Sequence, residues 1–241
     1  RILSNTAQGI DVDNTHGGGI FLDKMATNGS TVYFNRNILQ NNKAGEGFGG
    51  SGGGARVGDI DSSDVDIKGN QIVENTTTDS GGGLHIGKVS KGSLDLSGNE
   101  ISQNTIYSNA LRHGGGVYFD QMEKGAVITM TGNTIVENRA TGNGGGCYVE
   151  GTGVWGIYDG VAFIFRQNHV DHNIADQDGG GCYFINEKKI LKSLLDFMDN
   201  TFNHNTAGRN YGGVFVSELE NSRLRFWDNQ LIGNRAGIFD T

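Results

Sequence analysis

The chain has 241 residues, including 41 glycines and no proline, and a formal net charge of −8 at pH 7. This acidic balance argues against nucleic acid or an anionic membrane surface as a partner. No stretch approaches the roughly 20 apolar residues of a transmembrane helix, so we expect no membrane insertion of this segment.

One pattern repeats along the whole chain. Each unit begins with two apolar residues in alternation, then has an asparagine, a single apolar residue and a second asparagine. The second asparagines are Asn5, Asn42, Asn75, Asn104, Asn138, Asn173, Asn205 and Asn234. Repetition at intervals of about 30 residues is typical of solenoid proteins.

The first predicted element of each unit is a strand with one buried face, because its apolar residues alternate. The pairs are Val32/Phe34, Val65/Ile67, Leu94/Leu96, Ile128/Met130, Phe163/Phe165, Leu195/Phe197 and Leu224/Phe226. A shorter strand follows between the two asparagines. The first asparagines are Asn37, Asn70, Asn99, Asn133, Asn168, Asn200 and Asn229.

A variable loop then leads to a glycine cluster and a third strand. The clusters lie at 17–19, 52–54, 81–83, 114–116, 144–146, 179–181 and 212–213. Glycine lets backbones pass closely at such a corner.

Three short strands per coil and about seven coils predict an all-β parallel β-helix, with two asparagine ladders and a glycine corner. Asparagine tolerates the left-handed conformation of a sharp corner, so we expect it to form the corners. We predict a single solenoid segment over 1–241. Its ends carry no capping repeat, so we expect it to be part of a longer protein or to meet neighbouring coils or end-to-end copies.

The motifs resemble the passenger repeats of the polymorphic outer-membrane protein family of autotransporters. Phe202-Asn203-His204-Asn205 matches the Phe-x-x-Asn element of that family, and Gly53-Gly54-Ala55 matches its Gly-Gly-Ala element. Elsewhere Ile, Leu or Val replaces Phe, and a third Gly replaces Ala. The resemblance implies a right-handed parallel β-helix and an extracellular or cell-surface location.

The middle residue of each third strand is predicted to point away from the core. Four successive coils place Tyr118, Tyr148, Tyr183 and Phe215 at this position. The insertion Glu150–Gly160, just after Tyr148, carries Trp155 and Tyr158. An aromatic column of this kind is suited to stacking against sugar rings or anchoring a protein partner. The alternative is that like residues stack on like in a parallel sheet.

Two clusters are candidate metal sites. Asp59, Asp61, Asp64 and Asp66 offer oxygen ligands for Ca²⁺. His172 and His204 occupy equivalent positions on neighbouring coils, with Asp171 and His169 nearby, which suggests a transition-metal site or an acid–base pair. Solvated acidic loops and surface histidines are the simpler interpretations.

Two cysteines, Cys147 and Cys182, follow successive glycine clusters at the same inward position. We expect them to stack on adjacent coils as buried thiols.

The even repetition favours a non-enzymatic structural or adhesive scaffold that presents its aromatic column and loops to a glycan or protein. A polysaccharide lyase or glycoside hydrolase is the first alternative, but fold alone does not carry activity and no paired carboxylates stand out. The second alternative is a stalk or filament segment that assembles end to end.

Overall fold

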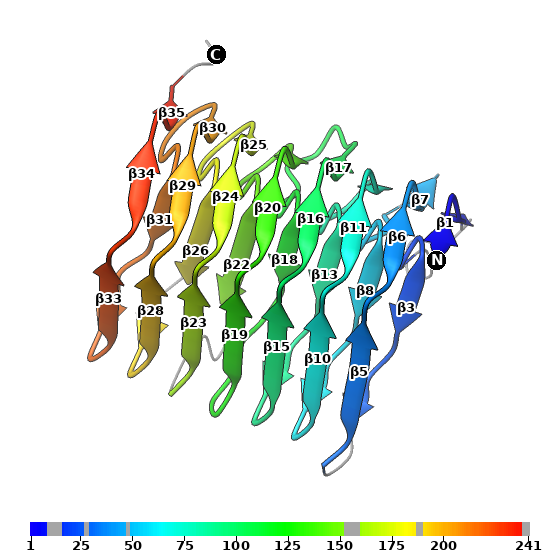
Figure 1. The fold of residues 1–241 in the computed structure, drawn as a ribbon, viewed down its shortest axis with the longest axis horizontal. Helices are drawn as coiled ribbons and strands as arrows, with labels where there is room; N and C mark the ends of the chain where they lie inside the picture. The colour runs from blue at the N-terminus through cyan, green and yellow to red at the C-terminus, as the bar shows by residue number, and fades with distance from the viewer. Residues whose placement is uncertain (9–15, 27–28, 47–48, 152–159, 187–189, 238–241) are drawn as a thin grey trace.

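A computed structural model describes the chain except for residues 9–15, 27–28, 47–48, 152–159, 187–189 and 238–241. The described residues form strands, turns and loops without a helix, so none of them forms a helix that is long and apolar enough to cross a membrane. All strand pairs are parallel, and each pairs with its equivalent in the neighbouring coil (Figure 1). The structure confirms the predicted parallel β-solenoid.

Sheet 1 contains the alternating strands, each of five residues. It is formed by β5 (Thr31–Asn35), β10 (Asp64–Lys68), β15 (Ser93–Ser97), β19 (Val127–Thr131), β23 (Ala162–Arg166), β28 (Leu194–Met198) and β33 (Arg223–Trp227). These seven strands correspond to the seven predicted coils and span about six turns.

Sheet 2 contains the strands between the two asparagines. It is formed by β1 (Ile2–Leu3), β6 (Ile38–Gln40), β11 (Gln71–Val73), β16 (Glu100–Ser102), β20 (Thr134–Val136), β24 (His169–Asp171), β29 (Thr201–Asn203) and β34 (Gln230–Ile232).

Sheet 4 contains the strands after the glycine clusters. It is formed by β3 (Ile20–Leu22), β8 (Ala55–Val57), β13 (Leu84–Ile86), β18 (Val117–Phe119), β22 (Cys147–Gly151), β26 (Cys182–Asn186) and β31 (Val214–Val216).

Sheet 3 was not expected, because three strands per coil were predicted. It follows the second asparagines and is formed by β2 (Thr6–Gln8), β7 (Lys43–Glu46), β12 (Thr76–Thr77), β17 (Thr105–Ile106), β21 (Arg139–Ala140), β25 (Ile174–Ala175), β30 (Thr206–Ala207) and β35 (Arg235–Ala236). Most of these strands have two residues, which is too short to show an alternating pattern in the sequence.

Two smaller sheets close the coils between sheets 4 and 1. They are formed by β4 (Met25–Ala26), β9 (Ile60–Asp61) and β14 (Val89–Ser90), and by β27 (Ile190–Leu191) and β32 (Leu219–Glu220).

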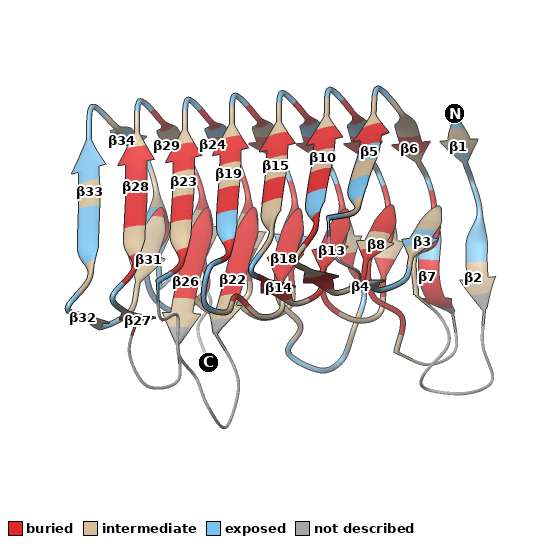
Figure 2. Cartoon of the chain, turned by 90° about the horizontal axis from the view of Figure 1, so that it is seen from below, coloured by how far each residue is buried: buried red, intermediate tan, exposed pale blue. Residues whose placement is uncertain are grey.

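The interior is one continuous apolar core, and Figure 2 shows that the most fully buried strands lie between the two ends. The early coils fill it with aliphatic side chains such as Leu39, Ile67 and Ile72. The later coils fill it with phenylalanines: Phe163 contacts Phe184 edge to face, with ring centroids 5.0 Å apart. The alternating residues predicted to face inward therefore do so in the inner coils, whereas Leu224 and Phe226 at the end of the solenoid are 39% and 43% exposed.

Two asparagine ladders connect the coils, as predicted. In the second ladder, Asn75 Nδ2 donates to Asn104 Oδ1 at 3.0 Å, and the Asn75 backbone N–H donates to the same oxygen at 3.0 Å. Asn75 Nδ2 also donates to the carbonyl of Leu39 in the preceding coil at 3.0 Å. Buried amides satisfied in this way stabilise the corners, because each unpaired polar group would cost free energy.

The ladder asparagines do not themselves adopt the left-handed conformation, contrary to our expectation. The residue before each of them does, with φ between 50° and 65°. These residues are Arg36, Gly69, Gly98, Gly132, Gln167, Asp199 and Asp228 in the first ladder, and Ser4, Asn41, Glu74, Gln103, Glu137, His172, His204 and Gly233 in the second. The preceding residue makes the bend, and the asparagine side chain turns inward to form the ladder.

The glycine corner is sterically required. A Cβ at Gly53 would lie 2.3 Å from the Gly82 carbonyl oxygen, and one at Gly54 would lie 3.0 Å from Asn75 Nδ2. The glycine clusters therefore pack directly on the next coil and on the second asparagine ladder.

Candidate binding face

The middle residues of sheet 4 form one continuous outer column, as the sequence predicted. The strand registers align Phe21, Arg56, His85, Tyr118, Tyr148, Tyr183 and Phe215 in that order. The three tyrosines form an apolar cluster separate from the main core, with Phe215 packed against it. We call Tyr118, Tyr148, Tyr183 and Phe215 the aromatic column.

The tyrosine rings of this column are not open platforms. Tyr118, Tyr148 and Tyr183 are only 7%, 4% and 7% exposed. Tyr148 stacks on Tyr118 and Tyr183, with centroid distances of 5.4 and 5.7 Å and interplanar angles of 4° and 8°. The expectation that these ring faces are available to sugars is therefore wrong, because parallel pairing places each ring face against the next ring. That the column takes part in binding a glycan or protein partner stays a prediction.

The ends of the column differ from its middle. Phe215 is partly buried and stacks on Tyr211, with centroids 4.4 Å apart, while Tyr211 is 48% exposed. Trp155 and Tyr158, the other two aromatic candidates, lie outside the described residues.

Toward the amino terminus the column becomes polar. His85 is buried, contacts the Tyr118 ring and has no hydrogen-bond partner at either ring nitrogen. Burial, reinforced by the charge of Arg56, lowers the pKa of His85 to about 3. Arg56 Nη1 donates to Ser51 Oγ and to His16 Nδ1, the latter at 3.3 Å, and burial lowers the pKa of Arg56.

Two carboxylates lie beside this polar end. Tyr118 Oη donates to Glu150 Oε2, and burial, followed by the Glu150 charge, raises the pKa of Tyr118. Burial also raises the pKa of Asp120, and the positive charge of Arg56 partly opposes this rise. A carboxyl group with a raised pKa next to an arginine, such as Asp120, occurs both in functional sites and in structural networks.

An ordered loop projects beside the aromatic column at residues 107–113, which we call the 107–113 loop. Tyr107 and Leu111 are 66% and 56% exposed there. The sequence analysis missed this loop. The sequence does indicate the loop by the length of one interval. Residues 105–113 separate Asn104 from Gly114, whereas only residues 139–143 separate the equivalent Asn138 and Gly144 in the next coil.

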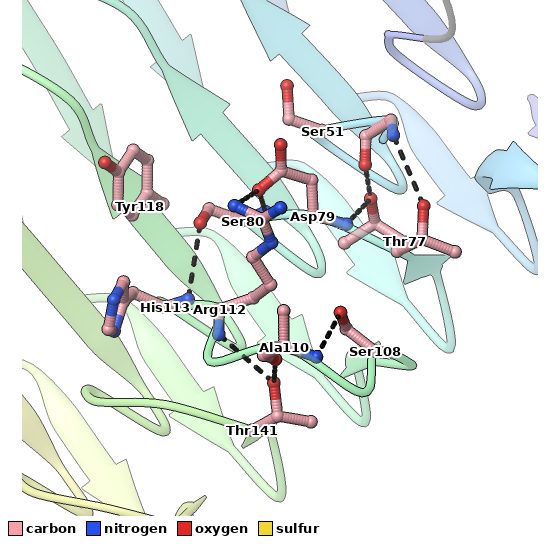
Figure 3. A network of polar contacts seen from close by, with 12 residues as sticks. Ser51, Thr77, Asp79, Ser80, Ser108, Ala110, Arg112, His113, Tyr118 and Thr141 are labelled. Carbon is pink, nitrogen blue, oxygen red and sulfur yellow. Dashed lines mark hydrogen bonds and ion pairs between the residues drawn. The ribbon is translucent and has the colours of Figure 1, made fainter. Parts of the chain in front are cut away.

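The preceding coil holds the 107–113 loop at both of its ends. The Tyr107 backbone N–H donates to the Thr77 carbonyl at 2.8 Å. The His113 N–H donates to Ser80 Oγ at 3.3 Å, and Arg112 pairs with Asp79 at 3.3 Å (Figure 3).

The following coil holds the middle of the loop. Thr141 Oγ1 donates to the Ala110 carbonyl at 2.9 Å and accepts from the Arg112 N–H at 3.2 Å (Figure 3). The His113 ring also stacks on Tyr148, with centroids 4.5 Å apart at 17°. The loop therefore contacts the aromatic column through His113 and is held by hydrogen bonds to both neighbouring coils.

Tyr107 lines two open grooves over sheet 3. One, of about 560 Å³, is also lined by Ser108, Asn109, Arg139 and Asp176. The other, of about 300 Å³, is lined by Lys43, Ala44, Thr76, Thr77 and Thr78 as well as Tyr107. Hydroxyl, amide and charged groups thus surround an exposed aromatic ring.

The predicted Ca²⁺ cluster is not formed. Asp59 Oδ1 accepts from the Lys88 backbone N–H at 3.2 Å, Asp61 Oδ1 accepts from Ser62 Oγ at 3.2 Å, and Asp66 pairs with Lys68 at 3.0 Å. Asp64 Oδ1 accepts from Ser93 Oγ. Asp59 precedes β9, Asp61 lies on it, and Asp64 and Asp66 lie on the outer face of β10, where each aspartate has a different partner.

The histidine candidates, in contrast, converge. Ligand atoms of Asp171, His172 and His204 all lie within 4.8 Å of one another, and this is the metal-type cluster found among the described residues. The two cysteines are in register on β22 and β26 and are buried free thiols, as predicted. Burial raises the pKa of Cys182.

Compared with protein-family models, curated proteins and solved structures, the chain matches none. The fold defines the class, a parallel β-solenoid repeat protein with asparagine ladders.

Proposed function

We propose that the chain is a non-enzymatic structural or adhesive scaffold of a secreted or cell-surface protein, and that it presents the 107–113 loop to a glycan. The observation that carries this proposal is the exposed Tyr107 on a loop held by both neighbouring coils. A loop fixed in advance binds with less loss of conformational entropy than a mobile one.

The repeat supports a scaffold role. Every coil pairs in parallel register with the next, and both ladders run through all the coils without interruption. The resemblance to autotransporter passenger repeats suggests the same role and an extracellular or surface location. The aromatic column then acts as an internal support for the loop, and the ligand binds at the grooves beside Tyr107.

One observation favours the alternative of a carbohydrate-active enzyme. Asp120 has a raised pKa beside Arg56, and Glu150 accepts a hydrogen bond from Tyr118 nearby. Glycoside hydrolysis uses a pair of carboxyl groups, and the one that acts as the acid has a raised pKa.

The experiment is a polysaccharide binding panel with product analysis by mass spectrometry. Tyr107→Ala is compared with the wild type and with Tyr33→Ala, a change at an equally exposed tyrosine, 71% exposed, on sheet 1. We expect retention on at least one glycan, about tenfold weaker in Tyr107→Ala and unchanged in Tyr33→Ala, without products.

Products from the wild type that disappear in Asp120→Asn would replace the scaffold proposal with the enzyme alternative. Retention equal in all three proteins would overturn the assignment of Tyr107, and no retention on any glycan would overturn the glycan assignment.

A further inference from the structure

The corner after β24 gathers two histidines and a carboxylate from two neighbouring coils. Asp171 Oδ1 lies 2.9 Å from His172 Nδ1 and 3.3 Å from His204 Nδ1. The two imidazole rings lie side by side, with centroids 4.9 Å apart at 25°. All three ligand atoms lie on one side of the solenoid, within a sphere small enough for one ion.

These separations fit a metal ion. Bonds of about 2.0–2.2 Å from Zn²⁺ to imidazole nitrogen or carboxylate oxygen place two ligands of a tetrahedron roughly 3.3–3.5 Å apart. The two distances from Asp171 are close to this value, so small side-chain rotations would complete the coordination. Imidazole and carboxylate together suit zinc, nickel, cobalt or copper better than calcium or magnesium.

The backbone orients both histidines in the same way. His172 and His204 are the left-handed residues before successive ladder asparagines, with φ of 53° and 50°. Because the coils are in register, this conformation repeats the side-chain direction from one coil to the next. In earlier coils the same position holds Gln103 and Glu137, whose side chains hydrogen-bond at 2.8 Å.

The next coil leaves space for the second histidine. The equivalent residue there is Gly233, and a Cβ at this position would lie 2.7 Å from His204 Cδ2. Any other residue at 233 would displace the imidazole.

A third histidine supports the carboxylate from the other side. His169 Nε2 lies 3.5 Å from Asp171 Oδ2, and His169 Nδ1 lies 2.6 Å from Thr201 Oγ1. The Asp171 side chain is only 18% exposed, whereas those of His172 and His204 are 60% and 52% exposed. The carboxylate is therefore held in place, and the imidazoles are accessible to an ion and leave room for water as a further ligand.

We propose that Asp171, His172 and His204 form a binding site for one divalent transition metal ion, which joins two adjacent coils, with His169 orienting Asp171. This site is independent of the glycan surface at Tyr107.

The test is titration of the metal-free protein with ZnCl₂ by isothermal calorimetry. The variants are His172→Gln, His204→Gln and the double variant, because the chain already has a glutamine at the equivalent left-handed position, Gln103. Glu74→Gln, at the equivalent position in another coil, is the matched control. We expect one Zn²⁺ per chain, binding at least tenfold weaker in each single variant, no saturable binding in the double variant and no change in the control.

A second measurement separates ligation from loss of structure. Co²⁺ bound by two imidazoles and a carboxylate gives visible absorption bands, which the double variant would lack while keeping the wild-type circular dichroism spectrum. Zinc binding retained in the double variant, or absent from the wild type, would overturn the proposal.

Discussion

The aromatic column and the 107–113 loop both carry tyrosines, but the structure uses them in opposite ways. Tyr148 in the column is 4% exposed and stacked on both sides, whereas Tyr107 in the loop is 66% exposed and borders two grooves. His113 joins the two regions through its contact with Tyr148. In a solenoid, therefore, regular repetition of an aromatic residue indicates support, and an irregular aromatic residue in a longer loop is the better candidate for recognition.

The largest effect should come from removing a column ring. Tyr148→Ala deletes a buried side chain stacked on three rings, so we expect a loss of about 3–5 kcal/mol in the free energy of unfolding. Tyr107→Ala should change it by less than about 0.5 kcal/mol, because that residue is exposed. Urea denaturation followed by circular dichroism measures both.

Tyr148→Phe is the control for the first change. It keeps the stacked ring, so we expect a loss below about 1.5 kcal/mol. Equal stabilities of Tyr148→Ala and Tyr107→Ala would remove the distinction between the two regions.

Acidification should have the second largest effect on stability, through two histidines beside the tyrosines of the column. Burial lowers the pKa of His85 to about 3 and that of His113 to about 4, from an ordinary value of 6.5. Below pH 6.5 these two histidines bind protons in the unfolded chain, whereas in the folded chain they stay neutral down to their lowered pKa values. Stability should therefore be lost as the pH falls from about 6.5 to about 4, by up to about 1.4 kcal/mol per pH unit for each histidine.

His85→Phe isolates this effect from the other titrating groups. It keeps a ring in the column and removes two buried nitrogens without hydrogen-bond partners, so stability at pH 7 should stay equal or rise. The difference between variant and wild type should grow as the pH falls, in denaturation curves at pH 7, 6, 5 and 4. A constant difference would show that His85 is not held neutral.

The smallest effect on stability should come from the anchor of the loop. Arg112→Ala removes a partly exposed ion pair with Asp79, so we expect a loss below about 1 kcal/mol. Glycan retention should nevertheless weaken severalfold, because the loop would be less well ordered before binding. Arg209→Ala, which removes a hydrogen bond of 2.8 Å to Gln177 in another loop, is the control and should not change retention.

The fold was predictable because each coil repeats the same residue types at the same positions. Asn75 and Asn104 are 29 residues apart, yet they hydrogen-bond at 3.0 Å, and parallel registry makes that pairing readable from the sequence. The two-residue strands of sheet 3 were not predicted, because two residues carry no period. The corner conformation was assigned to the asparagine, but it belongs to the residue before it, such as Glu74 with φ of 56°.

The candidate sites were less predictable. The sequence placed Tyr118, Tyr148 and Tyr183 outside the main core, which is correct, but it could not show that their rings cover one another and are buried. It also grouped Asp59, Asp61, Asp64 and Asp66 by proximity in the chain, although the fold gives each of them a different hydrogen-bond or ion-pair partner.

The sequence by itself determined the coils, the inward-facing residues and both asparagine ladders, because these depend only on position within the repeat. Only the tertiary structure decided which outward-facing residues reach solvent and which polar groups converge. Those properties depend on loops and side chains from different coils, as when His204 meets Asp171 at 3.3 Å across 33 residues of sequence.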